Sequence, residues 1–301
     1  MKLAVVILTC NVRELSISCL ESIYKSEPEA KSWQIIVVDN ASSDGTVGAV
    51  RKRFGKVGII ESPKNVGFAA GNNLAMRKIR AEYVLFLNPD TVVTPGAISK
   101  SVAFLALRPE VGSLTCRVDL PDRRLDYSCH RGFPTPWNAL CYFGGLAKMF
   151  PKVKLFSGYT ATYQDLSRPH EIDCGSGTFF LVRYEAGARV GWWDEDYMWN
   201  GEDIEFCFRL RQMGYHVYFY PEARIVHYKG STSGLWSTAK KEVPLETKLR
   251  SAKWASQAMR IFYRKHYLAN TPKVVAWMIE KGIDALEKRR LAKLIAGQKY
   301  E

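Results

Sequence analysis

Short apolar runs alternate with amphipathic stretches through the first third of the chain, and this alternation constrains the fold more than any other feature. Four apolar runs read as strands, the third being weaker than the others: 3–8, 34–38, 59–60 and 83–87. Apolar residues at helical spacing fill the stretches between and after them: 14–26, 45–54 and 69–80. Continuous apolar strands alternating with helices are typical of a parallel sheet buried on both faces. We therefore predict an α/β fold with a Rossmann-like, mostly parallel central sheet flanked by helices.

Polar side chains gather where the predicted strands end. Thr9 and Asn11 follow the first strand, the run 39–45 follows the second, and Asn88 and Asp90 follow the fourth. Ligands of open parallel sheets bind beyond the carboxyl ends of the strands, so these clusters predict one shared pocket. Turn formation and helix capping are the competing explanation, because Asn, Asp, Ser and Gly favour both.

The remainder of the chain is less regular. Residues 113–163 contain several prolines and an aromatic stretch, and they predict irregular structure. Strand-like and helical patterns then follow in this order: a strand at 177–182, a charged helix at 202–213, strands at 217–220 and 223–227, and helices at 244–268 and 273–296.

Composition excludes several classes of protein. With 47% apolar and 24% charged residues, the chain has neither a disordered nor a fibrous composition. No apolar run approaches the roughly 20 residues of a membrane-spanning helix, and residues 3–8 are too short for a signal-peptide core. Seven cysteines without a C-x-x-C pair fit reduced cytosolic thiols better than a disulfide framework or a zinc site.

Two common nucleotide-binding motifs are missing from the sequence. A dinucleotide site would show G-x-G-x-x-G directly after the first strand, where this chain has Thr-Cys-Asn-Val-Arg at 9–13, and no Walker A sequence occurs. We infer that the sheet holds a nucleotide through acidic and amide side chains instead. Asp39, at the end of a strand, can accept two hydrogen bonds from a base edge or a ribose diol.

Five motifs occur in order along residues 1–230. They are Val-Ile-Leu-Thr-Cys-Asn at 6–11, Val-Val-Asp-Asn-Ala-Ser-Ser-Asp-Gly-Thr at 37–46, Asn-Val-Gly-Phe-Ala-Ala-Gly-Asn-Asn at 65–73, Leu-Asn-Pro-Asp at 87–90 and Gly-Glu-Asp at 201–203. Together they resemble family 2 glycosyltransferases, inverting nucleotide-sugar transferases with the GT-A fold. The resemblance implies a set of donor-binding residues: Thr9, Asn11, Asp39, Asn40, Asp44, Asn65, Gly67, Asn72, Asn88 and Asp90. A simple turn before the following helix is the alternative for Asn65 and Gly67.

The same resemblance implies a divalent cation. Asn88-Pro89-Asp90 stands in place of the family's D-x-D motif, which holds Mg²⁺ or Mn²⁺ against the donor diphosphate. Because Asn88 replaces the first carboxylate, Asp90 is the lone acid, and this predicts either weaker metal dependence or a further ligand. We expect His227 in that role, since similar enzymes place a metal-binding histidine after a strand here; a capped or core histidine is the alternative.

Asp203 matches the family's catalytic base. In an inverting transfer the acceptor hydroxyl attacks the anomeric carbon, and a positioned carboxylate takes its proton. A capping-box-like helix start, with Asn200 as the N-cap, is the competing local explanation. The resemblance places five residues on the acceptor side: Gly175, Ser176, Gly177, Trp199 and Glu202. For Trp199, stacking on a sugar and ordinary packing are both open.

The end of the chain is basic. Residues 240–301 hold 15 Lys and Arg against 6 Asp and Glu, so they supply most of the net charge of +13 that the whole chain carries. We expect a GT-A catalytic domain at 1–235, divided into a nucleotide-sugar-binding half (1–112) and an acceptor-binding and catalytic half (113–235). A basic amphipathic helical extension follows at 236–301. It either packs on the catalytic domain or contacts an anionic leaflet, where each basic residue near the surface adds about 1 kcal/mol to the binding free energy. No motif suggests nucleic-acid binding.

These features predict transfer of a single sugar from a nucleotide-diphosphate donor to a glycan or a polyprenyl-diphosphate-linked saccharide, in cell-surface polysaccharide synthesis. Among similar sequences Asn-Pro-Asp often accompanies dTDP-rhamnose, so we favour that donor over UDP-galactose, UDP-glucose and UDP-GlcNAc. The Q-x-x-R-W motif of processive members is missing. The rival hypotheses are a nucleotidyltransferase, which would carry a glycine-rich loop, and a non-catalytic glycan-binding relative, which would have lost Asp90 or Asp203. We expect a cytoplasmic protein, peripheral on the inner face of the plasma membrane if the basic tail binds lipid.

Overall fold

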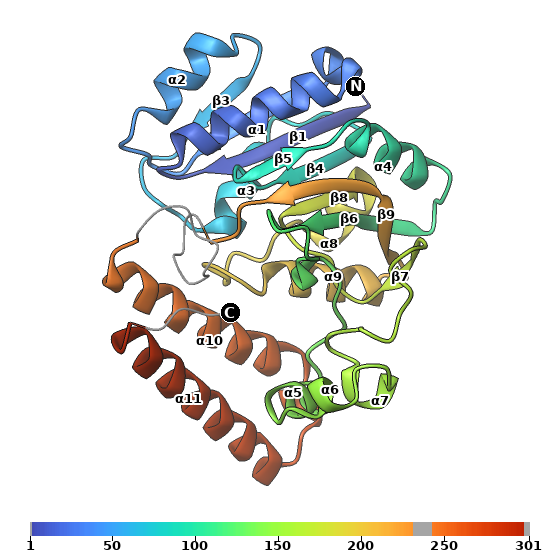
Figure 1. Ribbon diagram of the computed structural model, residues 1–301, viewed down its shortest axis with the longest axis vertical. Helices are drawn as coiled ribbons and strands as arrows, with labels where there is room; N and C mark the ends of the chain where they lie inside the picture. Colours follow the sequence, from blue (N-terminus) through green and yellow to red (C-terminus); the bar gives the residue numbers. More distant parts are fainter. Residues whose placement is uncertain (1, 231–242, 298–301) are drawn as a thin grey trace.

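A central β-sheet with helices packed against it dominates the computed structural model, which describes residues 2–230 and 243–297 (Figure 1). The strands are β1 (Leu3–Thr9), β2 (Gln34–Asp39), β3 (Gly58–Glu61), β4 (Tyr83–Leu87), β5 (Thr91–Val93), β6 (Val111–Asp119), β7 (His170–Ile172), β8 (Phe179–Arg183) and β9 (His216–His227). Within the described residues these nine strands form one sheet in the order β3-β2-β1-β4-β8-β6-β9-β5, and β7 pairs with β9 outside this path.

Helices connect the strands and cover the sheet. The α-helices are α1 (Arg13–Ser26), α2 (Thr46–Arg53), α3 (Phe68–Met76), α4 (Ala97–Ala106), α5 (Pro136–Phe143), α6 (Leu146–Met149), α7 (Lys154–Ser157), α8 (Tyr184–Val190), α9 (Glu202–Gln212), α10 (Leu245–His266) and α11 (Lys273–Ile295). Short 3₁₀ turns occupy η1 (Pro28–Ser32), η2 (Tyr127–Cys129) and η3 (Leu268–Asn270). Since no described helix is both long and apolar enough, none of them could cross a membrane.

The first half of the sheet is the parallel unit that the sequence predicts. β1 pairs in parallel with β2 and β4, and β2 pairs in parallel with β3. Nearly every side chain of β1, β2 and β4 is buried, as expected for strands covered on both faces. Beyond β4 the sheet is mixed, because β8 lies antiparallel to β4 and four of the eight pairings are antiparallel.

The prediction of irregular structure over residues 113–163 is wrong at its beginning. β6 is a nine-residue strand in the middle of the sheet, between β8 and β9. Its buried positions include Ser113 and Thr115, so it lacks the continuous apolar run that marks β1. Side chains are buried on both faces of this strand, which the local sequence does not reveal.

The two runs predicted as separate strands at 217–220 and 223–227 are one strand, β9. Its pairing with β6 shifts register between Cys116 and Arg117, whose partners are Tyr220 and Arg224. Pro221 lies within the bulged stretch, where its lack of an N–H interrupts the ladder without ending the strand. β9 continues past the bulge and carries His227 to the end of the sheet at which β4 has its carboxyl end.

The two last helices form an antiparallel hairpin below the sheet (Figure 1). α10 buries Phe262 against Phe208 of α9, which attaches the hairpin to the rest of the molecule. Residues 236–242 and 298–301 of the predicted extension lie outside the described residues. The predicted division at 112/113 stays a prediction.

Candidate active site

The carboxyl ends of the first strands meet along one rim of the sheet. Thr9 pairs with Asp39 across β1 and β2, and the Asn40 amide donates to the Thr9 carbonyl at 2.8 Å. Asn88 follows β4, the next strand along, and its amide donates to the carbonyl of Thr178 at 3.1 Å. The rim therefore runs without a break from the β2 end to the segment before β8.

The same segment carries the rim to the start of α9. The amide of Gly177 donates to Oδ2 of Asp203 at 3.3 Å. Asp39, Asp90 and Asp203, far apart in the sequence, thus belong to successive parts of one rim.

Asp39 has one engaged and one unengaged carboxylate oxygen. Its Oδ2 accepts the amide of Ser42 at 2.9 Å, whereas Oδ1 is buried and has no hydrogen-bond partner in the described part of the chain. A buried oxygen without a partner is costly, so it is suited to accept a hydrogen bond from a ligand.

Asn11 and Asp44 fasten the loops after β1 and β2 to each other. Oδ1 of Asn11 accepts the amide of Ser43 at 2.8 Å, and Oδ2 of Asp44 accepts the amide of Arg13 at 2.9 Å. The two side chains shape the β2 end of the rim through these bonds.

Asn40 ties this end of the rim to the loop before α3. Its Nδ2 donates to Oδ1 of Asn65 and to the carbonyl of Gly67, at 3.0 and 3.1 Å. Gly67 has φ +86°, and a Cβ there would lie 2.5 Å from the sulfur of Met198. Asn65 also accepts the amide of Gly67 at 3.0 Å, so the turn considered above is present. Asn72 is separate, because its buried amide donates to Phe68 within α3 at 3.0 Å.

Asp90 and His227 face each other at the middle of the rim. Nε2 of His227 lies 3.3 Å from Oδ1 of Asp90, and its Nδ1 lies 3.0 Å from Oδ2 of Asp126. Lys229 donates to the other oxygen of Asp126 at 2.7 Å. Burial alone would lower the pKa of His227, but the two carboxylates outweigh it and raise the pKa to about 9. Burial would likewise raise the pKa of Asp126, yet His227 and Lys229 hold it far below its usual range.

This pair fits a divalent cation that takes most of its ligands from a donor. A carboxylate oxygen and an imidazole nitrogen converge, and Asp126 orients the ring through its other nitrogen, as second-sphere carboxylates do in metal sites. Among the described residues no group of three or more His, Cys, Asp or Glu side chains could hold a metal ion. Mg²⁺ and Mn²⁺ accept such a sparse protein shell when phosphate oxygens and water complete it.

Asp203 is held by Arg131, which no motif of the sequence singles out. Nη2 of Arg131 donates to Oδ2 of Asp203 and to the carbonyl of Gly175, both at 2.8 Å. The amide of Ile204 donates to Oδ1 at 2.8 Å. Both side chains of the pair are largely buried. The carboxylate is therefore fixed in orientation with its charge compensated.

The capping-box alternative for Asp203 is wrong. The N-cap of α9 is Gly201, at φ +86°, and no side chain caps the helix. An L side chain is disfavoured at this φ. Oδ2 of Asp203 faces Arg131, while Oδ1 accepts the amide of Ile204.

Glu202 lies next to Asp203 and is buried. Its Oε2 has no hydrogen-bond partner among the described residues. Burial, and then the charge of Asp203, raise the pKa of Glu202 well above that of an ordinary carboxyl group. A protonated Glu202 would be a hydrogen-bond donor beside the base.

The other residues assigned to the acceptor side have mixed positions. Ser176 donates to the hydroxyl of Thr178 at 3.0 Å within the segment that reaches Asp203. Trp199 is half-buried and packs beside Ala252 of α10 and Leu294 of α11. Packing against the C-terminal helices thus explains why Trp199 is partly buried.

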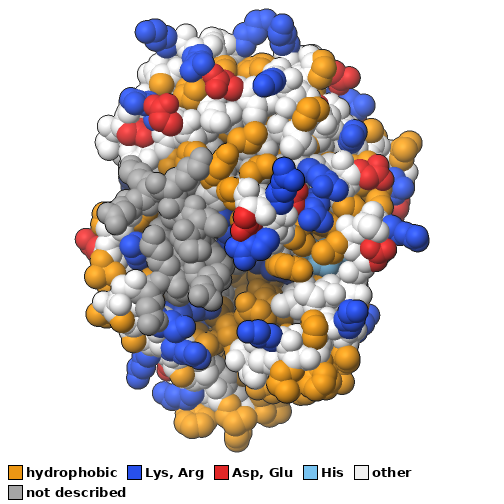
Figure 2. Space-filling view, in the orientation of Figure 1, with side chains coloured by type: hydrophobic (Ala, Val, Ile, Leu, Met, Phe, Trp, Pro, Cys, Tyr) orange, Lys and Arg blue, Asp and Glu red, His pale blue; other side chains and the backbone are white. Residues whose placement is uncertain are grey.

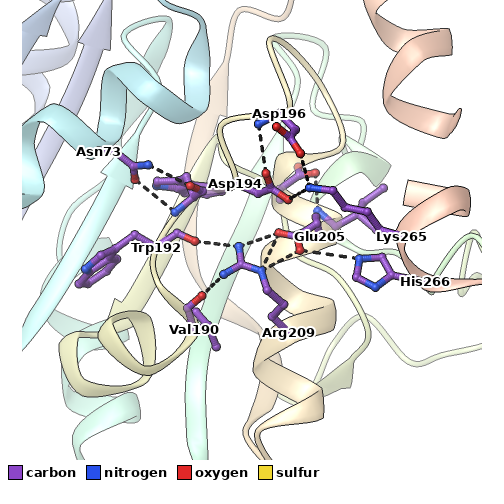
Figure 3. A network of polar contacts seen from close by, with 12 residues as sticks. Asn73, Val190, Trp192, Asp194, Asp196, Glu205, Arg209, Lys265 and His266 are labelled. Carbon is purple, nitrogen blue, oxygen red and sulfur yellow. Dashed lines mark hydrogen bonds and ion pairs between the residues drawn. The ribbon is translucent and has the colours of Figure 1, made fainter. Parts of the chain in front are cut away.

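A polar network fixes α9 against the rest of the molecule (Figure 3). Glu205 accepts two hydrogen bonds from Nε of Arg209 at 2.7 and 2.8 Å, and Arg209 also donates to the carbonyls of Val190 and Trp192. Lys265 of α10 pairs with Asp194 and Asp196, at 2.5 and 2.6 Å. The helix that presents Asp203 is therefore anchored from both sides.

Arg131 and Asp126 are the residues that sequence reasoning missed. Both lie in the stretch predicted to be irregular, where no period marks them. Asp126 is the last acidic residue before Asp165, and Arg131 is an isolated charge in an apolar context. An isolated charge of this kind is the signal that could have found Arg131, whereas Asp126 closely follows three other charged residues and carries no such signal.

Solved structures share the fold. The mannosyltransferase PcManGT from Pyrobaculum calidifontis, in complex with GDP-Man and Mn²⁺, superposes with a TM-score of 0.60 at 19% identity, over 98% of this chain and 73% of that one. The TarS protein of S. aureus (residues 1–349) gives 0.56 at 16% identity, over 100% and 93%. The GT-A architecture expected from the resemblance is confirmed.

Several relatives by sequence are named as glycosyltransferases. The N-acetylglucosaminyl-diphospho-decaprenol L-rhamnosyltransferase of Mycobacterium tuberculosis is 26% identical over 214 residues, covering 66% of this chain and 68% of that protein. Rhamnosyltransferase WbbL of Escherichia coli is 27% identical over 172 residues, covering 54% and 61%. A family model described as Glycosyl transferase family 2 matches residues 4–191. The chain therefore belongs to glycosyltransferase family 2.

Proposed function

We propose that this glycosyltransferase moves one sugar, with inversion, from a nucleotide-diphosphate donor to a hydroxyl of a glycan or lipid-linked saccharide. The observation that carries the proposal is the single rim that bears Asp39, the Asp90–His227 pair and Asp203. Such a rim can hold a nucleotide, a diphosphate and a base in the order that the reaction needs.

The donor would lie along the rim with its nucleotide at the β2 end. The unpartnered Oδ1 of Asp39 would accept a hydrogen bond from the base or ribose. Thr9, Asn11, Asn40, Asp44, Asn65 and Gly67 form the surrounding loops, and Asn88 would lie by the diphosphate; Asn72 stays a prediction. We favour dTDP-rhamnose, since two relatives are named rhamnosyltransferases and Asn88-Pro89-Asp90 replaces the usual D-x-D motif.

Asp90 and His227 would hold Mg²⁺ or Mn²⁺ at the middle of the rim. When bound, the cation neutralises negative charge on the departing diphosphate. Asp126 keeps the ring of His227 in place through Nδ1. Support comes from PcManGT, whose structure contains Mn²⁺ and GDP-Man.

Asp203 would take the proton of the acceptor hydroxyl as that oxygen attacks the anomeric carbon. Arg131 and Gly177 fix the carboxylate in orientation before the acceptor arrives. Glu202, protonated near neutral pH, would donate a hydrogen bond that positions the acceptor. Gly175, Ser176, Gly177 and Trp199 are proposed to line the acceptor side.

We further propose a lipid-linked acceptor and a role in cell-surface polysaccharide synthesis. The Mycobacterium tuberculosis relative is named for a diphospho-decaprenol acceptor, which supports this choice. Such an acceptor lies at a bilayer, so the enzyme would work from the cytoplasm as a peripheral protein on the inner face of the plasma membrane.

Hydrolysis of a panel of nucleotide sugars, with and without Mn²⁺, tests the proposal. We expect dTDP-rhamnose to be turned over faster than UDP-galactose, UDP-glucose and UDP-GlcNAc. Asp90→Asn should weaken the stimulation by Mn²⁺, whereas Asp122→Asn, on an exposed turn, should not. If no nucleotide sugar is hydrolysed above the buffer rate and none binds by calorimetry, the proposed function falls.

A further inference from the structure

Large apolar side chains are exposed at the end of the molecule opposite β3, the lower end in Figures 1 and 2. On α5–α7, Leu140, Met149 and Leu155 are 60%, 69% and 59% exposed. On the first turns of α11, Trp277 and Met278 are 62% and 53% exposed. We call this surface the lower face and define it by Leu140, Phe143, Met149, Leu155, Trp277 and Met278. A patch that gathers so many large side chains marks an interaction site rather than chance exposure.

The charge around the lower face has one sign. Residues 127–164 contain no Asp or Glu, and neither do residues 272–279. Lys148, Lys152, Lys154 and Lys273 are exposed among the apolar side chains. Within the described ranges none of the four has an ionic partner; Lys154 only lies over the ring of Tyr163, at 5.9 Å.

The basic residues in the last two turns of α10 do not provide such a surface. Arg260 pairs with Asp284 and Glu287 of α11, both at 2.8 Å. Arg264 pairs with Glu280 at 2.8 Å, and Lys265 pairs with Asp194 and Asp196. These cations hold the hairpin together and attach it to the catalytic region. Lys148, Lys152, Lys154 and Lys273, by contrast, have no acidic partner among the residues that the structure describes.

We propose that the lower face docks on an anionic lipid bilayer. Protein interfaces are depleted in lysine, whereas aliphatic and aromatic side chains interspersed with lysine suit the boundary between lipid headgroups and acyl chains. Lysine stems can lie along the apolar surface while their ammonium groups reach the lipid phosphates. The mixture therefore favours a bilayer over a second copy of this chain.

The lower face is directly joined to the candidate acceptor side. The excursion that carries α5–α7 leaves the site at Gly132 and returns at Tyr159, where the Gly132 amide donates to the Tyr159 carbonyl at 2.8 Å. The neighbouring Arg131 contacts Asp203. Docking would thus bring the base toward the surface from which a lipid-linked saccharide projects. Only this last step rests on the proposed function; the binding itself does not.

Co-sedimentation of the full chain with vesicles tests the proposal. The wild type should bind phosphatidylglycerol–phosphatidylethanolamine vesicles at least about tenfold more tightly than phosphatidylcholine vesicles. Leu140→Ser/Met149→Ser/Leu155→Ser, and separately Lys148→Gln/Lys152→Gln/Lys154→Gln, should each weaken that binding about tenfold or more. Leu107→Ser/Met213→Ser is the matched control, since these exposed apolar side chains lie outside the lower face, and it should bind like the wild type.

Three results would overturn the proposal. The first is that the wild type fails to bind anionic vesicles, and the second is that both triple variants bind them as well as the wild type does. The third is a dimer in solution that the triple serine variant dissociates, since a second copy of this chain would then cover the lower face. Donor hydrolysis without vesicles is measured in parallel. If vesicle binding behaves as expected but no donor is hydrolysed, the lower-face proposal stands and the proposed function fails. If donors are hydrolysed but vesicle binding does not behave as expected, the proposed function stands and the lower-face proposal fails.

Discussion

At the scale of single residues, Arg131 connects three parts of the site through one guanidinium group. It donates to the carboxylate of Asp203 and to the carbonyl of Gly175, and burial leaves its Nε without a partner in the described part of the chain. Burial alone would lower the pKa of Arg131, but the neighbouring Asp203 outweighs this effect and raises that pKa above its usual range. The two residues therefore keep their charges only as a pair.

Arg131→Met should destabilise the fold by about 3–5 kcal/mol, because it leaves the largely buried Asp203 without its counter-charge. Urea unfolding measures this loss. Arg124→Met, which removes an exposed ion pair, is the control and should cost no more than about 1 kcal/mol.

A double-mutant cycle separates pairing from simple loss of packing. Arg131→Met/Asp203→Asn should be less destabilised than the sum of the single variants, because the uncompensated charge is gone. Additive effects would mean that the ion pair does not support the fold.

Asp203→Asn should reduce kcat by about 10²–10⁴-fold while donor binding stays close to that of the wild type, since the amide cannot accept the acceptor proton. Steady-state kinetics and calorimetry with the donor nucleotide measure the two quantities. Asp122→Asn provides an exposed control. Near-normal turnover in Asp203→Asn would remove the base assignment.

At the scale of elements, α10 keeps α9, the helix that carries Asp203, in place. Phe262 is buried between Phe208 and the rings of His266 and Tyr267. Burial raises the pKa of Glu205, but His266 and Arg209 outweigh that effect and lower it. Apolar contacts and ion pairs thus act together where the C-terminal hairpin meets the catalytic region.

Phe262→Ala should cost about 3–5 kcal/mol and loosen the hairpin before the sheet. Hydrogen exchange checks this order of events: amides of α10 and α11 should exchange faster, while those of β1 keep their protection. Leu268→Ala, at an exposed position, is the control. Equal loss of protection in α10 and β1 would show that the hairpin and the sheet unfold as one unit.

At the scale of the whole molecule, a buried histidine connects acid stability to the junction between β9 and the segment that follows β6. Nε2 of His130 lies 2.7 Å from Nε2 of His170, and its ring packs edge-on against Phe219. Burial, and then the proximity of His170, lower the pKa of His130 to about 4. The folded chain therefore keeps His130 neutral at pH values where an unfolded chain protonates it.

Stability should consequently fall as the pH drops from about 6.5 to about 4, where the unfolded state binds a proton that the folded state refuses. The contribution of His130 to this loss is roughly 3 kcal/mol. His130→Gln should flatten the loss between these pH values, as urea unfolding at several pH values would show. His216→Gln, at an exposed position, should keep the wild-type slope. An unchanged slope in His130→Gln would contradict the assignment.

The sequence alone determined the parallel half of the sheet and the motifs along its rim. β1, β2 and β4 are continuous apolar runs, and a run of that kind must be buried on both faces whatever its neighbours are. Because parallel strands end at one edge, the polar residues after them were predictable as a shared site, and the order of the five motifs predicted the family.

The tertiary structure alone decided what surrounds those motifs. β6 contains buried hydroxyl side chains and shows no clear strand pattern, and the proline within β9 makes one strand read as two. Arg131 and Asp126 reach Asp203 and His227 across 72 and 101 residues. Such pairings depend on where distant segments pack, and local periodicity carries no record of them. The lower face has the same origin, because exposure of an apolar side chain is a property of the folded surface.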